Sequence, residues 1–487
     1  MSWYRDRLFW IVLLGSLLFF SLIQFSTPHM VGVDGFYHIK HAQLTAQQGI
    51  LDPFVWWTAS IHSVADGHFL FHILLIPFTF LGLTLGAKVA VVVFATLSAL
   101  AFFLFLYPRL GRWALIWLLI YFVFGSQALF RLIFEIRPHV GALALLILYS
   151  WLLFSSRFIA LGLLTFFFVW YYPAFNLLGI MLLLWVIITY FLEKKIAWGA
   201  LLSTGLGCLL GLVINPFFPD NIRLIYLQVV HVLFFPVQGV NIFPADIQPY
   251  ASFSEFFSLF WFIFLLSIVC YWLFMRHKLY TQKDIAFLGT WALVNFFLLL
   301  RFLRFIEYWV PFTLLFCALV LHRTFLSSLS VETLRKVFFT TLAILSILLV
   351  FSFQMQSSQI VKADQALGFY QYGDCVTWLQ EHTPSGSVVF TNWYEFPPLF
   401  FFNDHNYYIF GEDPHYLYFY NAAMYRAYEE VLYGQSLTPA QTVRDVFGAR
   451  YVLANKKLMP EWKKYLDAFS GLHKQVETKY CAVYEVI

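Results

Sequence analysis

Long runs of apolar residues, broken by short polar loops, fill roughly the first 360 positions of the chain. Runs of about twenty apolar residues match the thickness of a lipid bilayer and predict membrane-spanning helices. The first run, residues 8–25, follows Arg5 and Arg7 and lacks a small-x-small cleavage site, so we expect a retained anchor helix. Further helices are predicted at about 84–107, 112–130, 137–154, 157–172, 173–192, 197–217, 256–275, 284–300, 302–322 and 336–355.

The basic residues between these runs predict the topology. If consecutive helices alternate in direction, one side carries Arg5/Arg7, Arg109/Arg112, Arg157, Lys194/Lys195, Arg276/Lys278 and Arg335/Lys336. The positive-inside rule assigns that side to the cytoplasm. The segments 26–83 and 218–255, the link around Glu135 and the region after about 360 then share the opposite side. A helix pair hidden within 218–255 would preserve this arrangement, so we expect about 11–13 helices.

The pattern changes at the C-terminal end, where charges become more frequent and apolar runs shorten. Short strands are predicted at 387–391 and 450–454, an amphipathic helix at 414–433 and a terminal hairpin at 473–486. We therefore expect two domains. Residues 1–360 would form a transmembrane domain with outer loops 26–83 and 218–255, and residues 361–487 a small soluble α/β domain.

Composition agrees with this interpretation. Hydrophobic residues make up 61% of the 487 residues and charged residues only 11%, which is too little polar surface for a water-soluble globule of this size. The predicted fold class is a polytopic α-helical membrane protein with a small soluble α/β domain. The formal net charge of +4 is explained by the basic loops, and no basic patch indicates a nucleic-acid partner.

The cysteines divide into two groups. Cys208, Cys270 and Cys317 lie in predicted spans and are interpreted as small packing residues. Cys375 and Cys481 lie near the two ends of the C-terminal domain, so in an oxidising compartment they could pair, the alternative being two free thiols. No Cys/His spacing typical of a zinc site, no GxSxG motif and no glycine-rich phosphate loop is present.

Charged residues gather in the predicted outer loops and in the apolar segments beside them. The segment Asp-Gly-Phe-Tyr-His-Ile-Lys, residues 34–40, follows the first predicted helix directly, and Glu135 and Asp246 lie in two later loops. Charges at or within a membrane are costly enough that they mark functional sites by default. Carboxylates suit Mg²⁺ or Mn²⁺, and arginines suit phosphate or pyrophosphate. Together these residues indicate a lipid-phosphate substrate, although Asp34 and Glu135 could also simply cap helices.

The layout resembles a known family. An anchor helix, an acidic loop with Asp-Gly-Phe-Tyr-His, many spans and a soluble outer domain resemble the C-type (GT-C) membrane glycosyltransferases, most closely the oligosaccharyltransferase catalytic subunits. Asp34 matches the first-loop aspartate that in this family binds metal and faces the acceptor. Glu135-Ile-Arg137 lies where the family has two acids spaced by one residue, with Arg137 replacing the second acid. Asp246, two residues before Gln248-Pro249, matches an acid of the family's mobile outer loop.

Two later segments extend the resemblance. Arg304 lies where a membrane arginine of the family contacts the donor's pyrophosphate, and residues 393–397 (Trp-Tyr-Glu-Phe-Pro) resemble the acceptor-reading WWDYG motif in altered form. Each match also has a purely structural interpretation: core packing for Trp393 and Tyr394, a turn for residues 248–249, and pairing with Glu307 for Arg304. The resemblance implies catalytic roles for Asp34 and Asp246, a Mg²⁺ or Mn²⁺ ion held by Asp34, Glu135 and Asp246, and substrate contacts by His38, Lys40, Arg137, Arg301, Arg304, Trp393, Tyr394 and Glu395.

The expected activity is inverting transfer of a sugar or oligosaccharide from a polyprenyl-phosphate or pyrophosphate carrier. Its acceptor would be a glycan, a lipid or a protein at the outer face of a bacterial or archaeal plasma membrane, where the protein contacts membrane lipids. Two alternatives stay open. A transporter or flippase of lipid-linked or anionic substrates would place its binding residues near the bilayer midplane within inverted repeats, and no such repeat is visible. A noncatalytic scaffold would retain the fold after losing the second acid.

Overall fold

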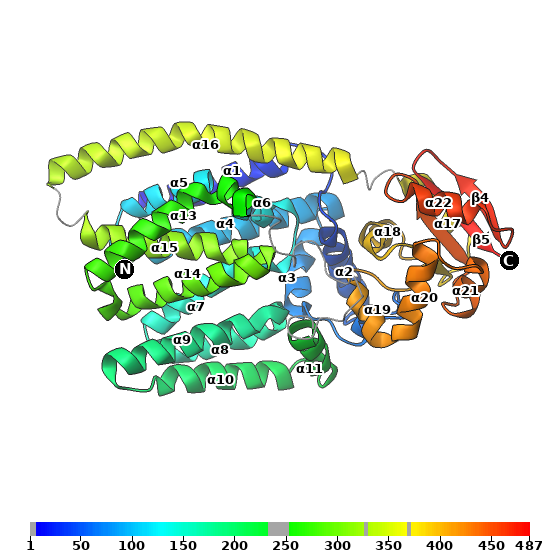
Figure 1. The fold of residues 1–487 in the computed structure, drawn as a ribbon, viewed down its shortest axis with the longest axis horizontal. Coiled ribbons are helices and arrows are strands. Elements are labelled where there is room, and N and C mark those ends of the chain that lie inside the picture. Colours follow the sequence, from blue (N-terminus) through cyan, green and yellow to red (C-terminus); the bar gives the residue numbers. More distant parts are fainter. Residues whose placement is uncertain (1–5, 232–252, 326–329, 368–371) are drawn as a thin grey trace. The chain divides into compact units, whose positions relative to one another are not determined.

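The structure, a computed structural model, describes residues 6–231, 253–325, 330–367 and 372–487. The described residues divide into two compact units. The helical unit comprises the described parts of Met1–His29, Thr84–Asn215 and Pro244–Ala363. The mixed unit comprises those of Met30–Leu83, Pro216–Phe243 and Asp364–Ile487. Figure 1 shows the helices and strands of both units with their labels.

Each predicted apolar run of the helical unit is a helix. The run at 112–130 differs because it forms two helices, which are bent by 81° at a break of a few residues. The helices are α1 (Arg7–Gln24), α4 (Leu83–Leu110), α5 (Trp113–Phe124), α6 (Ser126–Phe134), α7 (Pro138–Phe154), α8 (Phe158–Tyr171), α9 (Asn176–Glu193), α10 (Trp198–Val213), α13 (Phe253–Arg276), α14 (Lys283–Arg301), α15 (Ile306–Thr324) and α16 (Val331–Leu367).

Length and composition qualify seven helices of the described residues as membrane spans, or eight if the bent pair α5 and α6 counts as one. Four further apolar helices have 10–17 residues. These four are α7, α8, α10 and α3 (Phe69–Thr79). The expected 11–13 spans are therefore reached only if the shorter helices also cross, which a thinned bilayer or neighbouring helices permit. The chain is an integral membrane protein in either case.

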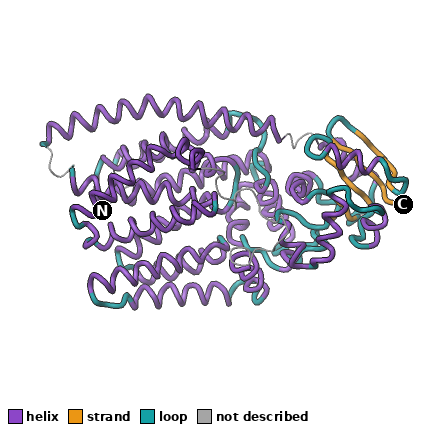
Figure 2. The backbone as a smooth tube through the Cα atoms, viewed as in Figure 1, coloured by secondary structure: helices purple, strands orange, loops and turns teal. Residues whose placement is uncertain are grey.

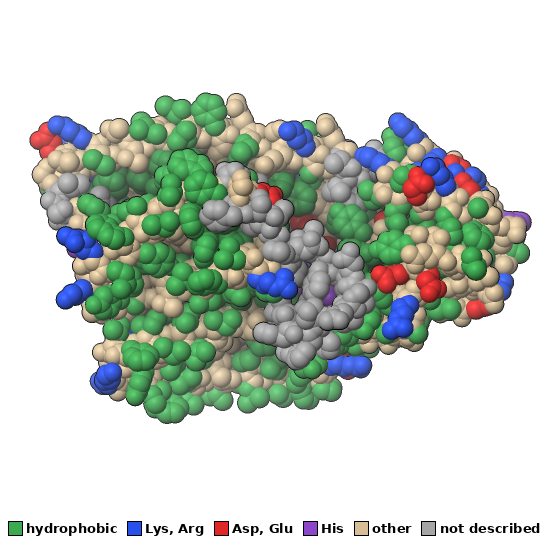
Figure 3. All heavy atoms as spheres, in the orientation of Figure 1, with side chains coloured by type: hydrophobic (Ala, Val, Ile, Leu, Met, Phe, Trp, Pro, Cys, Tyr) green, Lys and Arg blue, Asp and Glu red, His purple; other side chains and the backbone are tan. Residues whose placement is uncertain are grey.

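The surface of the helical unit is suited to lipid. Its visible face in Figure 3 is covered mainly by hydrophobic side chains, with Lys and Arg at one end. The apolar window of α16 is only 17% buried although its mean hydropathy is 2.2, so lipid must cover most of this helix. In Figure 1 the α9–α10 turn, the α13–α14 turn and the start of α16 lie at the same end of the unit, as the alternation of basic loops predicts.

The mixed unit contains one five-stranded sheet with the order β2-β1-β3-β5-β4. Strands β2 (Tyr407–Tyr408), β1 (Val388–Phe390) and β3 (Tyr451–Asn455) are parallel, and β5 (Cys481–Val486) pairs antiparallel with both β3 and β4 (Leu472–Glu477). Figure 2 shows these strands near the C-terminus of an otherwise helical chain. The two predicted strands and the terminal hairpin are thus confirmed.

Helices cover this sheet and bury its apolar side chains. Phe390, Val452 and Tyr484 of the strands pack with Tyr428 and Trp462 of the helices in one core. The helices of the unit are α2 (Asp34–Gln48), α3, α11 (Asp220–Ile225), α17 (Gly373–His382), α18 (Phe396–Phe402), α19 (Pro414–Tyr420), α20 (Ala422–Leu432), α21 (Pro439–Asp445) and α22 (Pro460–Asp467), with a one-turn η2 at Ile61–Val64 and a short π-helix, η4, at Tyr226–His231.

The single helix predicted at 414–433 is wrong, because two helices, α19 and α20, occupy that range. Asn421 separates them with extended backbone, and its side-chain oxygen accepts hydrogen bonds from the backbone N–H groups of Ala423 and Met424. An asparagine that caps a helix in this way starts a new helix rather than continuing the old one. The prediction of helical structure in this range was therefore correct, but the prediction of one continuous helix was not.

The first predicted outer loop folds with the C-terminal residues rather than apart from them. Trp57 forms a parallel bridge with Tyr408, and the backbone N–H of Ala59 donates to the carbonyl of Ile409 at 2.8 Å. The indole of Trp56 donates to the carbonyl of Asp404 at 2.8 Å. Backbone pairing of this kind makes residues 30–83 part of the mixed unit, so the compact units differ from the predicted division at residue 360.

A disulfide joins Cys375 of α17 to Cys481 of β5. The two cysteines are 106 positions apart, so the bond closes nearly the whole C-terminal domain into one covalent loop. Of the two alternatives left open by the sequence, pairing is the one that the structure contains. Cys208, Cys270 and Cys317 are free, as expected for packing residues.

Candidate functional site

Asp34 is the first residue of α2, so the expected acidic loop is in fact the beginning of a helix. The helix ends at Gly49, which has a positive φ of 85° that glycine adopts without strain. His38 follows Asp34 by one turn and therefore shares its helix face. Asp34 is half-buried, whereas His38 is only 3% exposed. The structure thus brings these two predicted site residues together on one helix.

Lys40 has a different environment. Its ammonium lies 3.3 Å from a carboxylate oxygen of Asp404 and 3.3 Å from the side-chain oxygen of Gln43. Its side chain is 11% exposed. The ion pair joins α2 to the segment between α18 and β2. The predicted contact of Lys40 with substrate stays a prediction.

His38 belongs to a buried network that the sequence analysis did not identify. Its Nδ1 lies 2.8 Å from Nε2 of His72, and Nδ1 of His72 lies 2.6 Å from Oδ2 of Asp66. The other oxygen of Asp66 accepts the backbone N–H of His68 at 2.8 Å. All members come from α2, α3 and the short segment before α3. The available sequence signal was the spacing of the histidines: His38 and His41 are three apart in α2, and His72 of α3 follows the N-cap residue His68 by four.

The carboxyl group of Asp66 is ionised at any physiological pH. Burial alone would raise its pKa, but the adjacent imidazoles of His72 and His41 and the hydrogen bond from His72 outweigh burial, and the pKa lies far below its ordinary value. A negative charge is therefore held inside the mixed unit. Both of its oxygens accept hydrogen bonds.

His41, Asp66 and His72 are of a type that can hold a metal ion. Their ligand atoms lie within 4.8 Å of one another, and all three residues are buried. His41 Nε2 is 4.0 Å from Asp66 Oδ2. The predicted metal ligands are different residues: Asp34 belongs to the mixed unit, Glu135 belongs to the helical unit, and Asp246 lies outside the described residues.

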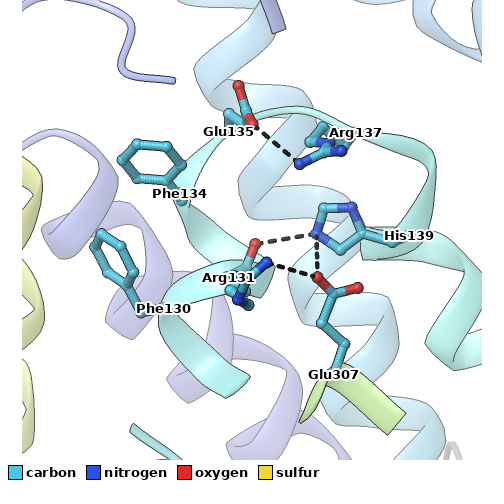
Figure 4. A pocket seen from close by; sticks show the side chains of 7 residues that line it. All are labelled: Phe130, Arg131, Phe134, Glu135, Arg137, His139 and Glu307. Carbon is cyan, nitrogen blue, oxygen red and sulfur yellow. Dashed lines mark hydrogen bonds and ion pairs between the residues drawn. The ribbon is translucent and has the colours of Figure 1, made fainter. Parts of the chain in front are cut away.

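A cavity of about 240 Å³ opens in the helical unit, at the link between α6 and α7. Figure 4 shows its charged side chains directed toward one another, with two phenylalanine rings beside them. Glu135 and Arg137 both have extended backbone, and residues two apart in an extended segment point to the same side. The seven lining residues are Phe130, Arg131, Phe134, Glu135, Arg137, His139 and Glu307.

Two ion pairs organise this cavity. Arg137 Nη1 lies 3.4 Å from Oε1 of Glu135, and Arg131 Nη1 lies 3.7 Å from Oε1 of Glu307. His139 Nε2 is 3.9 Å from the same Glu307 oxygen. Glu307 is 4% exposed, and its second oxygen, Oε2, has no hydrogen-bond partner among the described residues. The cavity therefore combines two guanidinium groups, two buried carboxylates, one of which has an unused oxygen, and an apolar wall.

The cavity contains carboxylates and an imidazole, but both carboxylates are paired with guanidinium groups. A cation would have to compete with the guanidinium of Arg137 for Glu135 and with Arg131 for Glu307. Guanidinium groups at these positions suit an anion instead. Arg131, His139 and Glu307 were not among the predicted site residues.

Arg301 and Arg304 lie on either side of the α14–α15 junction. Arg301 ends α14, is exposed, and its guanidinium stacks on the ring of Phe302 at 5.2 Å. Arg304 is half-buried in a single turn, η7 (Leu303–Phe305), that precedes α15. It is close enough to His139 to interact electrostatically, which associates it with the cavity. Glu307, which was one expected partner of Arg304, has Arg131 and His139 as neighbours.

The segment 393–395 forms one 3-10 turn, η10 (Trp393–Glu395), after β1. Glu395 is fully buried, accepting hydrogen bonds from the hydroxyls of Tyr372 at 2.7 Å and Thr391 at 3.0 Å. Burial raises its pKa to about 7 despite these donors. The carboxylate expected to face an acceptor is therefore inside the domain, because the Asn392 cap turns the chain inward.

The two aromatic residues of this segment are more accessible. Trp393 packs against the domain core, and its backbone N–H donates to the hydroxyl of Tyr428 at 2.8 Å. Tyr394 is half-buried beside it, with the two rings edge to face at 5.7 Å. Trp393 thus contacts the core from a partly buried position, and its predicted contact with substrate stays a prediction.

No family model and no curated protein matches the sequence. Solved structures do match. An apo oligosaccharyltransferase of Archaeoglobus fulgidus matches 100% of this chain and 75% of its own, with a TM-score of 0.64 and 13% identity. ArnT of Cupriavidus metallidurans, bound to undecaprenyl phosphate, matches 99% of this chain and 98% of its own, with a TM-score of 0.62 and 12% identity. The chain has the GT-C fold.

Other structures of the archaeal neighbour carry ligands. One is described as the enzyme AglB in complex with an inhibitory peptide and a dolichol-phosphate, at a TM-score of 0.63 and 14% identity. Another is a complex with zinc and sulfate, at a TM-score of 0.60 and 13% identity. These matches extend over both units of the present chain, so the fold predicted from the order of anchor helix, spans and outer domain is confirmed.

Proposed function

We propose that this protein is a membrane glycosyltransferase that transfers a sugar or oligosaccharide from a polyprenyl-phosphate or pyrophosphate carrier to an acceptor. The observation that carries the proposal is the fold shared, over essentially the whole chain, with transferases whose structures hold dolichol-phosphate or undecaprenyl phosphate. A lipid carrier also suits an enzyme whose surface is largely apolar, because the substrate reaches the protein through the membrane.

The cavity at the α6–α7 link is the proposed site for the carrier's phosphate. Arg131 and Arg137 supply planar guanidinium groups that can each donate two parallel hydrogen bonds to a phosphate. Phe130 and Phe134 supply an apolar wall for the first part of the lipid chain. Arg304 stabilises negative charge on the departing phosphate, together with the two cavity arginines.

Asp34 is the proposed general base or orienting group for the acceptor hydroxyl or amide. It is the first residue of α2, and the N-terminal end of a helix dipole favours a negatively charged side chain. The carboxylate takes the proton, or the hydrogen bond, of the acceptor while the acceptor atom attacks the anomeric carbon opposite the phosphate. The transfer is proposed to invert that carbon. Asp246 is proposed to contact the acceptor from the second outer loop.

A divalent metal such as Mg²⁺ or Mn²⁺ would supply charge neutralisation at the leaving phosphate. Of the residues proposed to bind it, Glu135 is paired with Arg137 and does not fit that role. The arginines of the cavity offer the same neutralisation without a metal, so no step is assigned to one.

The acceptor class stays broad: a glycan, a lipid or a protein. Glu395 stands where the acceptor-reading motif of oligosaccharyltransferases has its acid, and its burial argues against recognition of an asparagine sequon by this segment. A simpler acceptor, such as the sugar or lipid component of a cell-surface glycolipid, requires no peptide-reading motif.

The proposal is tested with the purified full-length protein in lipid nanodiscs. Polyprenyl-phosphate and polyprenyl-pyrophosphate sugars serve as donors, and released or transferred sugar is measured by mass spectrometry. We expect sugar release that Asp34→Asn abolishes and that the matched exposed control Asp374→Asn retains. Movement of intact donor across proteoliposomes without cleavage would instead establish the transporter alternative, and neither activity with any donor would favour the scaffold.

A further inference from the structure

Glu307 is a buried carboxylate whose capacity to accept hydrogen bonds is largely unused. It lies in the first turn of α15, lines the cavity and is 4% exposed. Its Oε1 is 3.7 Å from Nη1 of Arg131 and 3.9 Å from Nε2 of His139. Both distances exceed the range of about 2.7–3.2 Å that N–H···O hydrogen bonds occupy. Its Oε2 has no partner among the described residues. Buried carboxylates are normally satisfied by several donors, so this one requires an explanation.

The two charged neighbours of Glu307 are engaged elsewhere. Nε2 of His139 lies 3.0 Å from the backbone carbonyl of Arg131, and a carbonyl can only accept, so this nitrogen donates to it. Arg131 is one of the two arginines proposed to bind the carrier's phosphate. A phosphate that attracts this guanidinium would leave Glu307 without its cation, which is costly for a buried charge unless another donor reaches the carboxylate.

The arrangement of the cavity suits a donor group that arrives together with the phosphate. In Figure 4 the carboxylate of Glu307 points toward Arg131 and His139, while Glu135 and Arg137 lie at the other end of the labelled group. The anomeric carbon of a carrier-linked sugar is bonded to a phosphate oxygen, so the ring hydroxyls lie next to the phosphate. Each hydroxyl has a proton to donate, whereas the isoprenoid chain has none. A phosphate bound at Arg131 therefore brings sugar hydroxyls within reach of Glu307.

From these contacts we propose that Glu307 is a specificity-determining residue, which accepts a hydrogen bond from a hydroxyl of the donor's first sugar. The inference rests on the proposed function for the place of the phosphate. A site built to bind a hydroxyl discriminates strongly against a ligand that lacks it, because its own polar group is then left unpaired. The cavity should therefore prefer a sugar-loaded carrier to a sugar-free one. The spent carrier would dissociate more easily after transfer for the same reason.

A resident water is the competing explanation for the unused acceptor. The hydroxyl of Tyr121 in α5 is close enough to Glu307 to interact with it electrostatically, and it too has no hydrogen-bond partner among the described residues. A water between such groups would satisfy both of them. It would do so whether or not the ligand carries a sugar, so it predicts equal affinity for loaded and sugar-free carriers. A comparison of ligands therefore separates the two explanations.

The test compares ligands of equal charge on the full-length protein in lipid nanodiscs. Polyprenyl phosphates that carry a hexose, an N-acetylhexosamine or a pentose are titrated beside polyprenyl methyl phosphate, and the same series is made on pyrophosphate. We expect at least one loaded carrier to bind the wild type roughly 10-fold to 100-fold more tightly than its methyl ester, as a hydrogen bond to a charged group predicts. A preference below about fivefold for every sugar would overturn the proposal, and this comparison needs no variant to fold.

Glu307→Gln tests whether this residue is responsible. The amide keeps the side-chain volume, but its oxygen is a neutral acceptor, so the preference for the loaded carrier should fall by roughly fivefold to tenfold. The methyl ester should bind as tightly as before or more tightly, because no carboxylate then competes for Arg131. The matched control is Glu193→Gln, which changes an exposed acid that ends α9 and pairs with Lys283, and it should keep the wild-type preference. A wild-type preference in Glu307→Gln would overturn the assignment.

The outcomes distinguish this inference from the proposed function. Transfer of sugar by a wild type that binds loaded and sugar-free carriers equally would overturn the role of Glu307 and leave the transferase proposal standing. A Glu307-dependent preference in a protein that never cleaves the donor would support the sugar contact and refute the transferase. Binding of none of these carriers would refute the phosphate site, and the role of Glu307 with it.

Discussion

Arg137 lies 3.4 Å from Glu135, the acid two residues before it. The two side chains point to the same side because the link between α6 and α7 is extended. The resemblance implies two acids at this link, and Arg137 stands in the place of the second. We infer that an arginine at this position disfavours a cation and favours an anion. The proposed phosphate site follows from this single replacement.

Arg137→Gln should weaken donor binding. A charge-assisted hydrogen bond contributes about 1.5–3 kcal/mol, so loss of the guanidinium should raise the donor Kd by roughly 10-fold to 100-fold. Arg276→Gln, at the exposed end of α13, is the matched control and should bind donor like the wild type. Binding is measured by titration with a fluorescent polyprenyl phosphate. An unchanged Kd in Arg137→Gln would locate the phosphate elsewhere.

Arg304→Lys tests whether shape as well as charge is needed. Lysine keeps the charge but not the planar fork that binds two phosphate oxygens at once, so we expect a clear loss of donor affinity, of roughly tenfold. The same titration measures the donor affinity of this variant, and Arg276→Lys is its control. If affinity is kept and the thermal unfolding midpoint falls, Arg304 is structural.

Glu395 should make stability depend on pH. Its pKa is raised to about 7 from an ordinary value of 4.5, so the folded state holds a proton that the unfolded state releases. The stabilising effect is present at pH 4.5 and below, and is lost as pH rises through about 7. Glu395→Gln mimics the protonated acid and should therefore be more stable than the wild type at pH 8, by about 1–3 kcal/mol, but not at pH 5.

Thermal unfolding followed by tryptophan fluorescence at pH 5, 6, 7 and 8 measures this difference. Glu381→Gln, an exposed substitution on α17, is the control that should show no such trend. If the unfolding midpoints of the wild type and of Glu395→Gln changed with pH in parallel, this would contradict the raised pKa of Glu395. A raised acceptor KM in Glu395→Gln with unchanged stability would restore the acceptor-reading role.

The disulfide should contribute strongly to the stability of the mixed unit. Closing a loop of about a hundred residues restricts the unfolded chain, and such bonds contribute about 2–5 kcal/mol. Cys375→Ser with Cys481→Ser should lower the unfolding midpoint of the C-terminal domain by several degrees, and a reducing agent should have the same effect on the wild type. Cys208→Ala, in α10, should be neutral.

Lys40→Met distinguishes structure from substrate contact at a predicted site residue. The ion pair with Asp404 is largely buried on the lysine side, so its loss should destabilise the mixed unit by roughly 1–3 kcal/mol, because Asp404 is left without its cation. Donor KM should stay within twofold of the wild type. A large rise in KM with unchanged stability would return Lys40 to the substrate site.

The sequence by itself determined the membrane class, the apolar runs that form the helices of the helical unit and the central strands of the sheet. Its resemblance to a known family indicated the fold. Apolar runs of bilayer length and alternating strands are local patterns, and local patterns determine local elements. The same is true of Glu135 and Arg137, whose contact needs only an extended backbone between them.

Tertiary structure decided the surroundings of the candidate site residues, because those surroundings depend on contacts between residues far apart in the chain. Nothing near Glu395 in sequence indicates that Tyr372 and Thr391 enclose its carboxylate, and nothing near Lys40 indicates Asp404. Asp66 and His72 were overlooked because an acid and histidines scattered over two segments have no meaning until α2 and α3 pack together. Only then do Asp66, His72 and His38 form one chain of buried contacts.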